Sequence, residues 1–171
     1  MIKNILIIGL PKSGKSTLLK KIISSYKNKV GFITDEIREN QERKGFEIET
    51  SKGEKIILAH INFKTNYKVS KYFVKPENLD AVIRKISKFT KKDILYLDEI
   101  GEMELFSEKF KSLVEKFLNS KNVFIATLTK VYTDKFIEQL KKRNDILIIE
   151  LNENNRREVQ KEINKILDNK S

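Results

Sequence analysis

The feature that most constrains this chain is a short segment near its start. Residues 5–8 are Ile-Leu-Ile-Ile, residues 9–16 are Gly-Leu-Pro-Lys-Ser-Gly-Lys-Ser, and apolar residues then recur at helical spacing. Residues 9–16 fit the pattern G-x-x-x-x-G-K-[ST], a loop whose backbone N–H groups wrap around an anion. Such a loop requires a buried strand before it and a helix after it, and the flanking patterns predict both. The segment therefore predicts a phosphate-binding loop within an α/β fold.

The residue types in this loop indicate which ligand it binds. Gly9 and Gly14 allow the backbone to approach an anion closely, and the helix that follows adds the positive end of its dipole. Lys15 can reach the β- and γ-phosphates of a nucleotide, and the Ser16 hydroxyl can hold Mg²⁺. We therefore predict that the chain binds a nucleoside triphosphate together with Mg²⁺.

Strand and helix patterns alternate along the rest of the chain. Alternation of this kind predicts a three-layer α/β sandwich with a mainly parallel central sheet, and we expect residues 1–171 to form a single domain. The strands are expected at residues 5–8, 30–33, 45–50, 55–59, 71–74, 93–97, 122–127 and 146–149, and the helices at 18–26, 76–89, 105–117, 136–140 and 158–167. Residues 45–59 read as an added β-hairpin, whereas the polar, charged residues 34–44 are expected to form an exposed loop.

Composition excludes several classes of protein. The 171 residues include no cysteine, which rules out disulfides and thiolate metal sites, and no apolar run is long enough to span a membrane. The net charge is +11, but the lysines are spread among glutamates, as on a solvated surface. We expect a cytoplasmic protein, with a monomer favoured, for which nucleic acid is a less favoured partner.

Two consecutive acids follow the apolar strand expected at residues 93–97. In a parallel sheet, Asp98 would lie at the same edge as Ser16 and could support Mg²⁺. Glu99, the next residue, could orient or deprotonate an attacking water. The pair favours water as the phosphoryl acceptor over a hydroxyl group.

Other residues narrow the chemistry. The guanine-specificity pattern Asn-Lys-x-Asp does not occur, which argues against a guanine-only switch protein, and His60 is the only histidine. Positive charge on the departing phosphates is also needed. Arg38 and Arg43 are the favoured candidates because they follow a predicted core strand; the others are Arg143, Arg156 and Arg157.

With these residues identified, the chain resembles the nucleoside-triphosphatase family first described from thermophiles, whose animal members are called cancer-related nucleoside-triphosphatase. The likeness rests on residues 9–18, on 31–38 with 43–46, on 71–74, on Asn155-Arg156, and above all on Leu97-Asp98-Glu99-Ile100-Gly101-Glu102-Met103-Glu104-Leu105. The sequence departs from the family pattern at four places: Lys12 replaces a small residue, Ser16 replaces threonine, Gln41 falls where glycine is expected, and residues 132–134 match the family's post-strand segment poorly.

The resemblance implies a Mg²⁺-dependent phosphohydrolase that acts on ATP, GTP, CTP, UTP and TTP with little base discrimination. The nucleotide contacts that it implies come from the loop and from the segment around the two acids. These residues are Gly9, Leu10, Pro11, Lys12, Ser13, Gly14, Lys15, Ser16 and Thr17, then Leu95, Tyr96, Leu97, Asp98, Glu99, Ile100, Gly101 and Glu102.

Two alternatives share the phosphate-binding loop. A nucleoside or nucleotide kinase would need an acceptor pocket and a mobile lid, either of which the hairpin region could supply. A nucleotide-gated nucleic-acid-binding module would account for the +11 charge. Because the loop is paired with Asp98 and Glu99, we favour an NTP hydrolase, with Lys15 and Glu99 as its catalytic residues.

Overall fold

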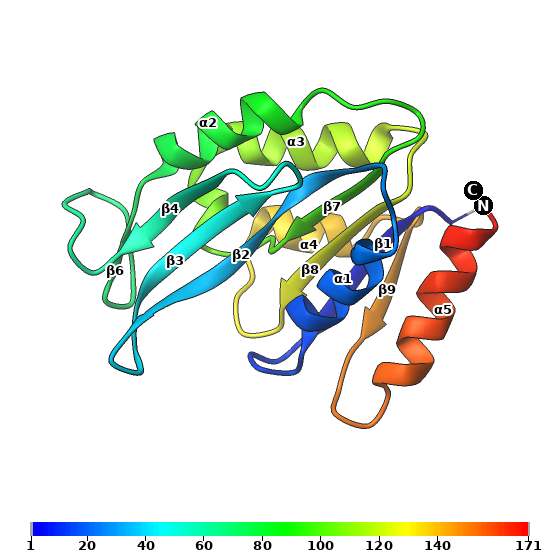
Figure 1. Cartoon of the computed structure of the whole chain (residues 1–171), viewed down its shortest axis with the longest axis horizontal. Helices are drawn as coiled ribbons and strands as arrows, with labels where there is room; N and C mark the ends of the chain where they lie inside the picture. The colour runs from blue at the N-terminus through cyan, green and yellow to red at the C-terminus, as the bar shows by residue number, and fades with distance from the viewer. Residues whose placement is uncertain (1, 171) are drawn as a thin grey trace.

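The computed structural model describes residues 2–170 and contains one continuous nine-stranded sheet with helices on both faces (Figure 1). The strand order is β5-β6-β4-β3-β2-β7-β8-β1-β9. The strands are β1 (Asn4–Gly9), β2 (Lys29–Glu39), β3 (Glu42–Thr50), β4 (Lys55–His60), β5 (Lys68–Val69), β6 (Tyr72–Val74), β7 (Ile94–Asp98), β8 (Phe124–Thr129) and β9 (Ile146–Glu150). The helices are α1 (Lys15–Ser24), α2 (Pro76–Ile86), the short 3-10 helix η1 (Glu104–Phe106), α3 (Glu108–Asn119), α4 (Lys135–Lys141) and α5 (Arg156–Asp168).

Strands β2, β7, β8, β1 and β9 form the parallel half of the sheet. All six residues of β8 are buried, as expected for a central parallel strand that is covered on both faces. Because the strands are parallel, their carboxyl ends meet at one edge. The loop after β1, the end of β7 and the end of β8 therefore lie together.

Helices cover the two faces of this sheet. The core on one face is built with α2, α3 and α4, and the core on the other face with α1 and α5 (Figure 1). The amphipathic patterns explain this arrangement, since α3 buries Phe110, Leu113, Val114, Phe117 and Leu118 along one stripe. The predicted three-layer α/β sandwich is confirmed. None of the helices within residues 2–170 is long and apolar enough to cross a membrane.

The other half of the sheet is antiparallel, and here one prediction is wrong. Residues 34–44 were expected to be an exposed loop, but β2 continues to Glu39 and turns directly into β3, with Glu39 paired to Glu42. This hairpin extends past the core, so it lacks the apolar alternation by which strands are recognised. Backbone pairing forms it instead, together with ion pairs from Glu36 to Arg38 and Arg43.

The hairpin expected at residues 45–59 is confirmed, because β3 pairs antiparallel with β4. The turn between these strands contains Gly53, whose φ of 82° is accessible to glycine without steric cost. Strands β6 and β5 then extend the sheet beyond β4. The antiparallel half is thus larger than the added hairpin that the sequence predicts.

Candidate active site

The loop between β1 and α1 has the conformation expected of an anion cradle. Gly14 has a φ of 93° and is the N-cap residue of α1, and the first residues of the helix line the cavity at the strand ends. The first turn of a helix has backbone N–H groups without partners inside the helix, which favours an anion at this position. Lys15 is buried, and its Nζ donates hydrogen bonds to the carbonyl oxygens of Gly9 (3.1 Å) and Leu10 (2.9 Å). Burial lowers the pKa of Lys15, whereas Glu99 and Asp98 oppose that shift.

Asp98 lies at the end of β7 and receives two hydroxyl groups. The Ser16 Oγ and the Thr127 Oγ1 both donate to Asp98 Oδ1, at 2.9 and 2.5 Å. Asp98 Oδ2 is buried and has no hydrogen-bond partner among the described residues. Burial raises the pKa of Asp98, and the two hydroxyl groups oppose the shift. The Ser16–Asp98 contact confirms that the chain brings these two residues together.

Glu99 and Glu104 form a second acidic group in the segment after β7. Burial raises the pKa of Glu99 to about 7, with a further contribution from the charge of Asp98. Glu104 is only 3% exposed; burial and then the charge of Glu99 raise its pKa well above the usual value. A Cβ built on Gly101 would lie 2.9 Å from Glu99 Oε1 and 3.0 Å from Glu104 Oε2. The two carboxyl groups therefore converge on Gly101.

A cavity of about 600 Å³ joins these groups at the carboxyl edge of the sheet. It is lined by Pro11, Lys12, Gly14, Lys15, Ser16, Thr17, Thr34, Glu36, Arg43, Phe46, Val69, Ser70, Tyr72, Asp98, Glu99, Glu102, Met103, Glu104, Thr129, Val131, Tyr132 and Arg156. Of the segment predicted at 95–102, Asp98, Glu99 and Glu102 line the cavity. Leu95, Tyr96 and Leu97 are buried within the sheet, and neither Ile100 nor Gly101 belongs to the lining.

The candidate arginines take different positions. Arg38 does not line the cavity, and its guanidinium contacts Glu36 and the Gln41 carbonyl oxygen. Arg43 lines the cavity, where its Nε donates to Tyr72 Oη (2.7 Å) and its Nη1 to Glu36 (3.0 Å).

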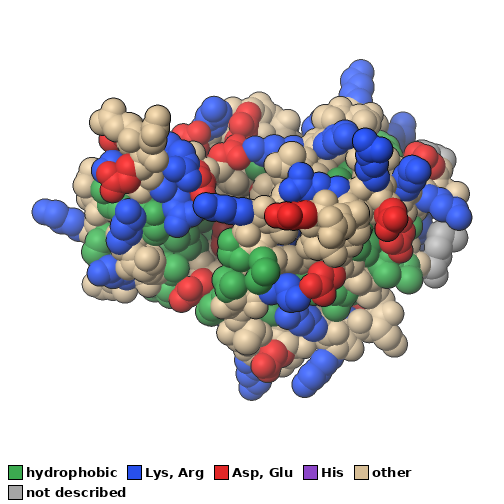
Figure 2. All heavy atoms as spheres, turned by 90° about the horizontal axis from the view of Figure 1, so that it is seen from below, with side chains coloured by type: hydrophobic (Ala, Val, Ile, Leu, Met, Phe, Trp, Pro, Cys, Tyr) green, Lys and Arg blue, Asp and Glu red, His purple; other side chains and the backbone are tan. Residues whose placement is uncertain are grey.

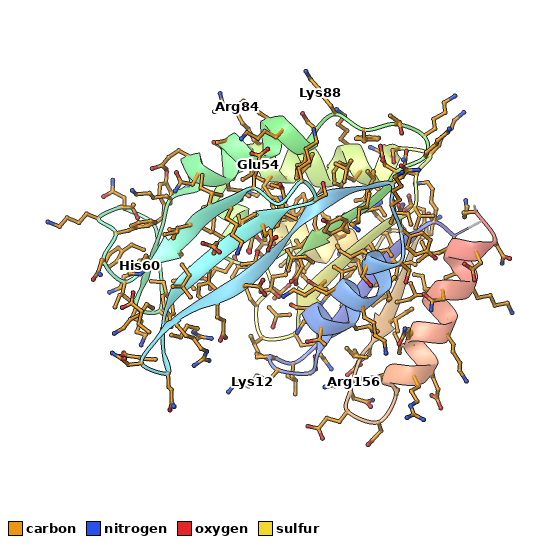
Figure 3. All side chains as sticks on the ribbon, in the orientation of Figure 1. Lys12, Glu54, His60, Arg84, Lys88 and Arg156 are labelled. Carbon is orange, nitrogen blue, oxygen red and sulfur yellow. The ribbon has the colours of Figure 1, made fainter. Side chains whose placement is uncertain are left out.

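Arg156 is the arginine nearest to the loop. Its Nη2 donates to the Ser13 carbonyl oxygen at 3.1 Å, and a Cβ added to Gly14 would lie 2.7 Å from the same nitrogen. Figure 3 shows Arg156 and Lys12 along the lower edge of the molecule, whereas His60 lies on the left, on β4. The sequence favours Arg38 and Arg43 because they follow a predicted core strand, and the one signal for Arg156 is the Asn155-Arg156 match within the family resemblance.

Sequence reasoning also missed Glu104, Thr34 and Thr127. Thr34 Oγ1 donates to the Asp98 carbonyl oxygen at 2.7 Å and so fixes the backbone where β7 ends. Threonine is common in strands, so its presence there predicts no functional role. The group to which its hydroxyl donates depends on which strand lies next to it. The signal for Glu104 was its place within the segment 97–105, on which the family resemblance rests most strongly.

Comparison with known proteins gives consistent matches along the chain. Residues 4–164 match the sequence model of a family described as NTPase. The chain is 44% identical over 165 residues to nucleoside-triphosphatase THEP1 of Thermotoga maritima, covering 95% of this chain and 94% of that protein. It is 33% identical over 175 residues to nucleoside-triphosphatase THEP1 of Aquifex aeolicus, covering 96% and 98%.

Solved structures agree with these sequence matches. The crystal structure of THEP1 from Aquifex aeolicus superposes with a TM-score of 0.81 at 32% identity, covering 94% of this chain and 96% of that one. The solution structure of a human cancer-related nucleoside triphosphatase has a TM-score of 0.80 at 24% identity, covering 96% and 97%. The second likeness shows a shared fold.

Proposed function

Because this chain belongs to the NTPase family and is a hydrolase, we propose that it is a Mg²⁺-dependent nucleoside-triphosphatase that converts NTP and water to NDP and phosphate. One observation carries the proposal: the loop lysine Lys15, the Ser16–Asp98 pair and Glu99 all line one cavity. This set can bind the triphosphate at one end and hold a water molecule at the other. The fold alone would not distinguish hydrolysis from other phosphoryl transfers.

The residues at the end of β7 are suited to Mg²⁺. Asp98 Oδ2 is a buried carboxylate oxygen without a hydrogen-bond partner within residues 2–170, and the Ser16 hydroxyl contacts the other oxygen of the same group. Mg²⁺ is commonly held by one or two carboxylates, with phosphate oxygens and water completing its shell. When bound, Mg²⁺ would neutralise charge on the β- and γ-phosphates. Ser16 and Asp98 are the residues that would hold it.

Glu99 is the proposed proton acceptor. The water oxygen forms a bond to the γ-phosphorus as the bond to the β–γ bridging oxygen breaks, and the water proton passes to the Glu99 carboxylate. Since its pKa is raised to about 7, Glu99 is a stronger base than an exposed glutamate yet still ionises near neutral pH. The remainder of the rate enhancement comes from the positioning of the reactants and from positive charge near the phosphates.

Lys15 and Arg156 are proposed to bind the phosphates. Lys15 Nζ hydrogen-bonds to two carbonyl oxygens of its own loop, and a bound triphosphate would offer it fully charged acceptors instead. Arg156 lies on the backbone of Gly14, beside the N–H groups that face the phosphates. Neither cation forms an ion pair among the described residues.

We also propose that the site discriminates little between bases. The described lining of the cavity contains no asparagine or glutamine side chain, whose amide group could read the edge of an adenine base. Tyr132 lies in the lining and offers an aromatic surface on which any base can stack. Values of kcat/KM for ATP, GTP, CTP, UTP and TTP are therefore expected to lie within about tenfold of one another.

Phosphate release from these five nucleotides, with Mg²⁺ and with a chelator, tests the proposal. Glu99→Gln should retain nucleotide binding and lose turnover by about 100-fold or more, because the amide cannot accept the proton. Glu108→Gln, which neutralises an exposed acid on α3, is the matched control and should keep its turnover. Release by Glu99→Gln at the wild-type rate would contradict the role of Glu99. Absence of release from every nucleotide by the wild-type protein would contradict the function.

A further inference from the structure

The cavity continues past the residues that handle the γ-phosphate. Across the sheet the order is β1, β8, β7, β2, β3, so the loop lies after β1, and Asp98 and Glu99 at the end of β7. The lining extends two strands further, to Glu36 on β2 and Phe46 on β3, which is roughly 10 Å beyond β7 at ordinary strand spacing. Hydrolysis requires only a water molecule beyond the γ-phosphate. The lining beyond β7 is therefore not required for attack by water.

This far side of the cavity is a built surface, which we call the hairpin wall and define as Glu36, Arg43, Phe46, Val69 and Tyr72. The Phe46 and Tyr72 rings are in an edge-to-face arrangement, 5.1 Å between centroids. The Arg43 guanidinium lies 5.2 Å from the Phe46 ring centroid and 5.3 Å from that of Tyr72. Its hydrogen bonds to Tyr72 and Glu36 fix it in this position.

The charges and shapes of the hairpin wall define what it could bind. Within the hairpin wall, the charges of Arg43 and Glu36 compensate each other, and Arg38, which pairs with the same carboxylate, does not line the cavity. Phe46 is half-buried and Val69 is partly buried, and both present apolar surface to the cavity. Glu36 retains carboxylate lone pairs that can accept a hydrogen bond from a hydroxyl group. The wall therefore suits a neutral, ring-bearing alcohol.

We propose that the hairpin wall is a second substrate subsite for a neutral ring-bearing alcohol of the nucleoside type, whose hydroxyl group can take the γ-phosphoryl group in place of water. The proposal rests on the nucleoside-triphosphatase function, because it uses the same nucleotide, bound in the same way. The hydroxyl oxygen forms a bond to the γ-phosphorus, and the bond from that phosphorus to the β–γ bridging oxygen breaks. The NDP leaves with the bonding electron pair, and the hydroxyl proton passes to the Glu99 carboxylate.

The test follows γ-labelled ATP with Mg²⁺ in the presence of adenosine, guanosine, cytidine or thymidine, and separates labelled phosphate from labelled nucleoside monophosphate. Labelled monophosphate from at least one nucleoside is the expected result. Two variants change the hairpin wall in opposite directions. Phe46→Ala removes an aromatic ring from the subsite, and Val69→Trp fills the subsite with a larger side chain. Each should reduce label transfer by about tenfold or more while phosphate release to water persists.

Persistent phosphate release also serves as the folding control for both variants. Phe63→Ala is the matched control, because it truncates an aromatic ring that lies outside this cavity and contacts Lys75. This variant should transfer label like the wild-type protein.

The outcomes separate the two proposals. Free phosphate as the sole labelled product with all four nucleosides would overturn the subsite, while leaving the hydrolase intact. Label transfer that is unchanged in both Phe46→Ala and Val69→Trp would overturn its location on the hairpin wall. Label transfer without any release to water would support the subsite and contradict the hydrolase. Absence of both products would overturn both.

Discussion

Asp98 and Glu99 are adjacent in the chain, yet the fold gives their carboxyl groups different surroundings. Asp98 is fixed by the hydroxyl groups of Ser16 and Thr127, which come from other elements. Glu99 lies in the cavity lining and approaches a second buried acid, Glu104. The pair of residues could be read from the sequence. The different roles proposed for the two carboxyl groups depend on the residues that each one contacts in the fold.

Glu104 supports a prediction about stability and pH. Its pKa is raised in the folded protein, so between its unfolded and folded pKa values the native state holds a proton that the unfolded state releases. Stability from this residue is therefore complete below about pH 4.5 and declines as pH rises above that value. Glu104→Gln removes the titration, so its free energy of unfolding should exceed that of the wild-type protein by more at pH 8 than at pH 5.

Denaturant unfolding at these two pH values, followed by circular dichroism, measures the difference. Glu108→Gln is the control, because it makes the same substitution at an exposed side chain. Unfolding free energies of wild-type and Glu104→Gln that differ equally at pH 5 and pH 8 would mean that Glu104 ionises normally in the folded protein.

At the scale of elements, the hairpin of β2 and β3 is the main difference between expectation and structure. Its strands carry charges on both sides at its tip, because that part extends past the helices and has no core to face. The alternation of apolar and polar residues that predicts a strand arises because one face of the strand is buried. A strand that is exposed on both faces therefore lacks this alternation. Pairing to β3 and β7 sets the path of β2.

The tip of this hairpin permits a stability prediction. Asn40 and Gln41 have φ angles of 50° and 64°, the left-handed region in which glycine has no steric cost. Gln41→Gly should stabilise the protein by up to about 1 kcal/mol, since relief of 1–2 kcal/mol of strain exceeds the entropy cost of glycine. Gln41→Val, which is β-branched, should destabilise it.

Thermal unfolding of the two variants measures both effects. The Arg38 contact at this tip is to the Gln41 carbonyl oxygen, so both variants retain it. A lower melting temperature for Gln41→Gly than for the wild-type protein would show that the turn does not hold residue 41 in this conformation.

At the scale of the whole molecule, many acidic side chains are paired with lysines or arginines, and the excess of 35 basic over 24 acidic residues gives the net charge of +11. Examples are Lys85 with Glu54, Lys111 with Glu108, and Lys130 with Glu150 at 2.6 Å. On the face seen in Figure 2, basic and acidic side chains are interspersed. This arrangement resembles a solvated surface more than a continuous track for a phosphodiester backbone.

Nucleic-acid binding should therefore be weak and sensitive to salt. We expect single-stranded oligothymidylate to bind with a dissociation constant weaker than about 1 µM at physiological ionic strength, because few phosphates would be neutralised together. Fluorescence anisotropy over a series of salt concentrations measures this. Tight binding that survives at physiological salt would instead favour a nucleic-acid-binding function for the basic surface.

The sequence by itself determined the features that are contiguous in the chain. The loop at residues 9–16, the acids at 98–99 and the alternation of strands and helices are local patterns, because each depends on residue types at short spacing. Only the tertiary structure decided which distant residues join them. Strand order sets Thr127 beside Asp98, and the docking of α5 brings Arg156 onto Gly14. The hairpin carries Arg43 and Phe46 across the cavity, because backbone pairing between strands, and not apolar pattern, sets where β3 lies.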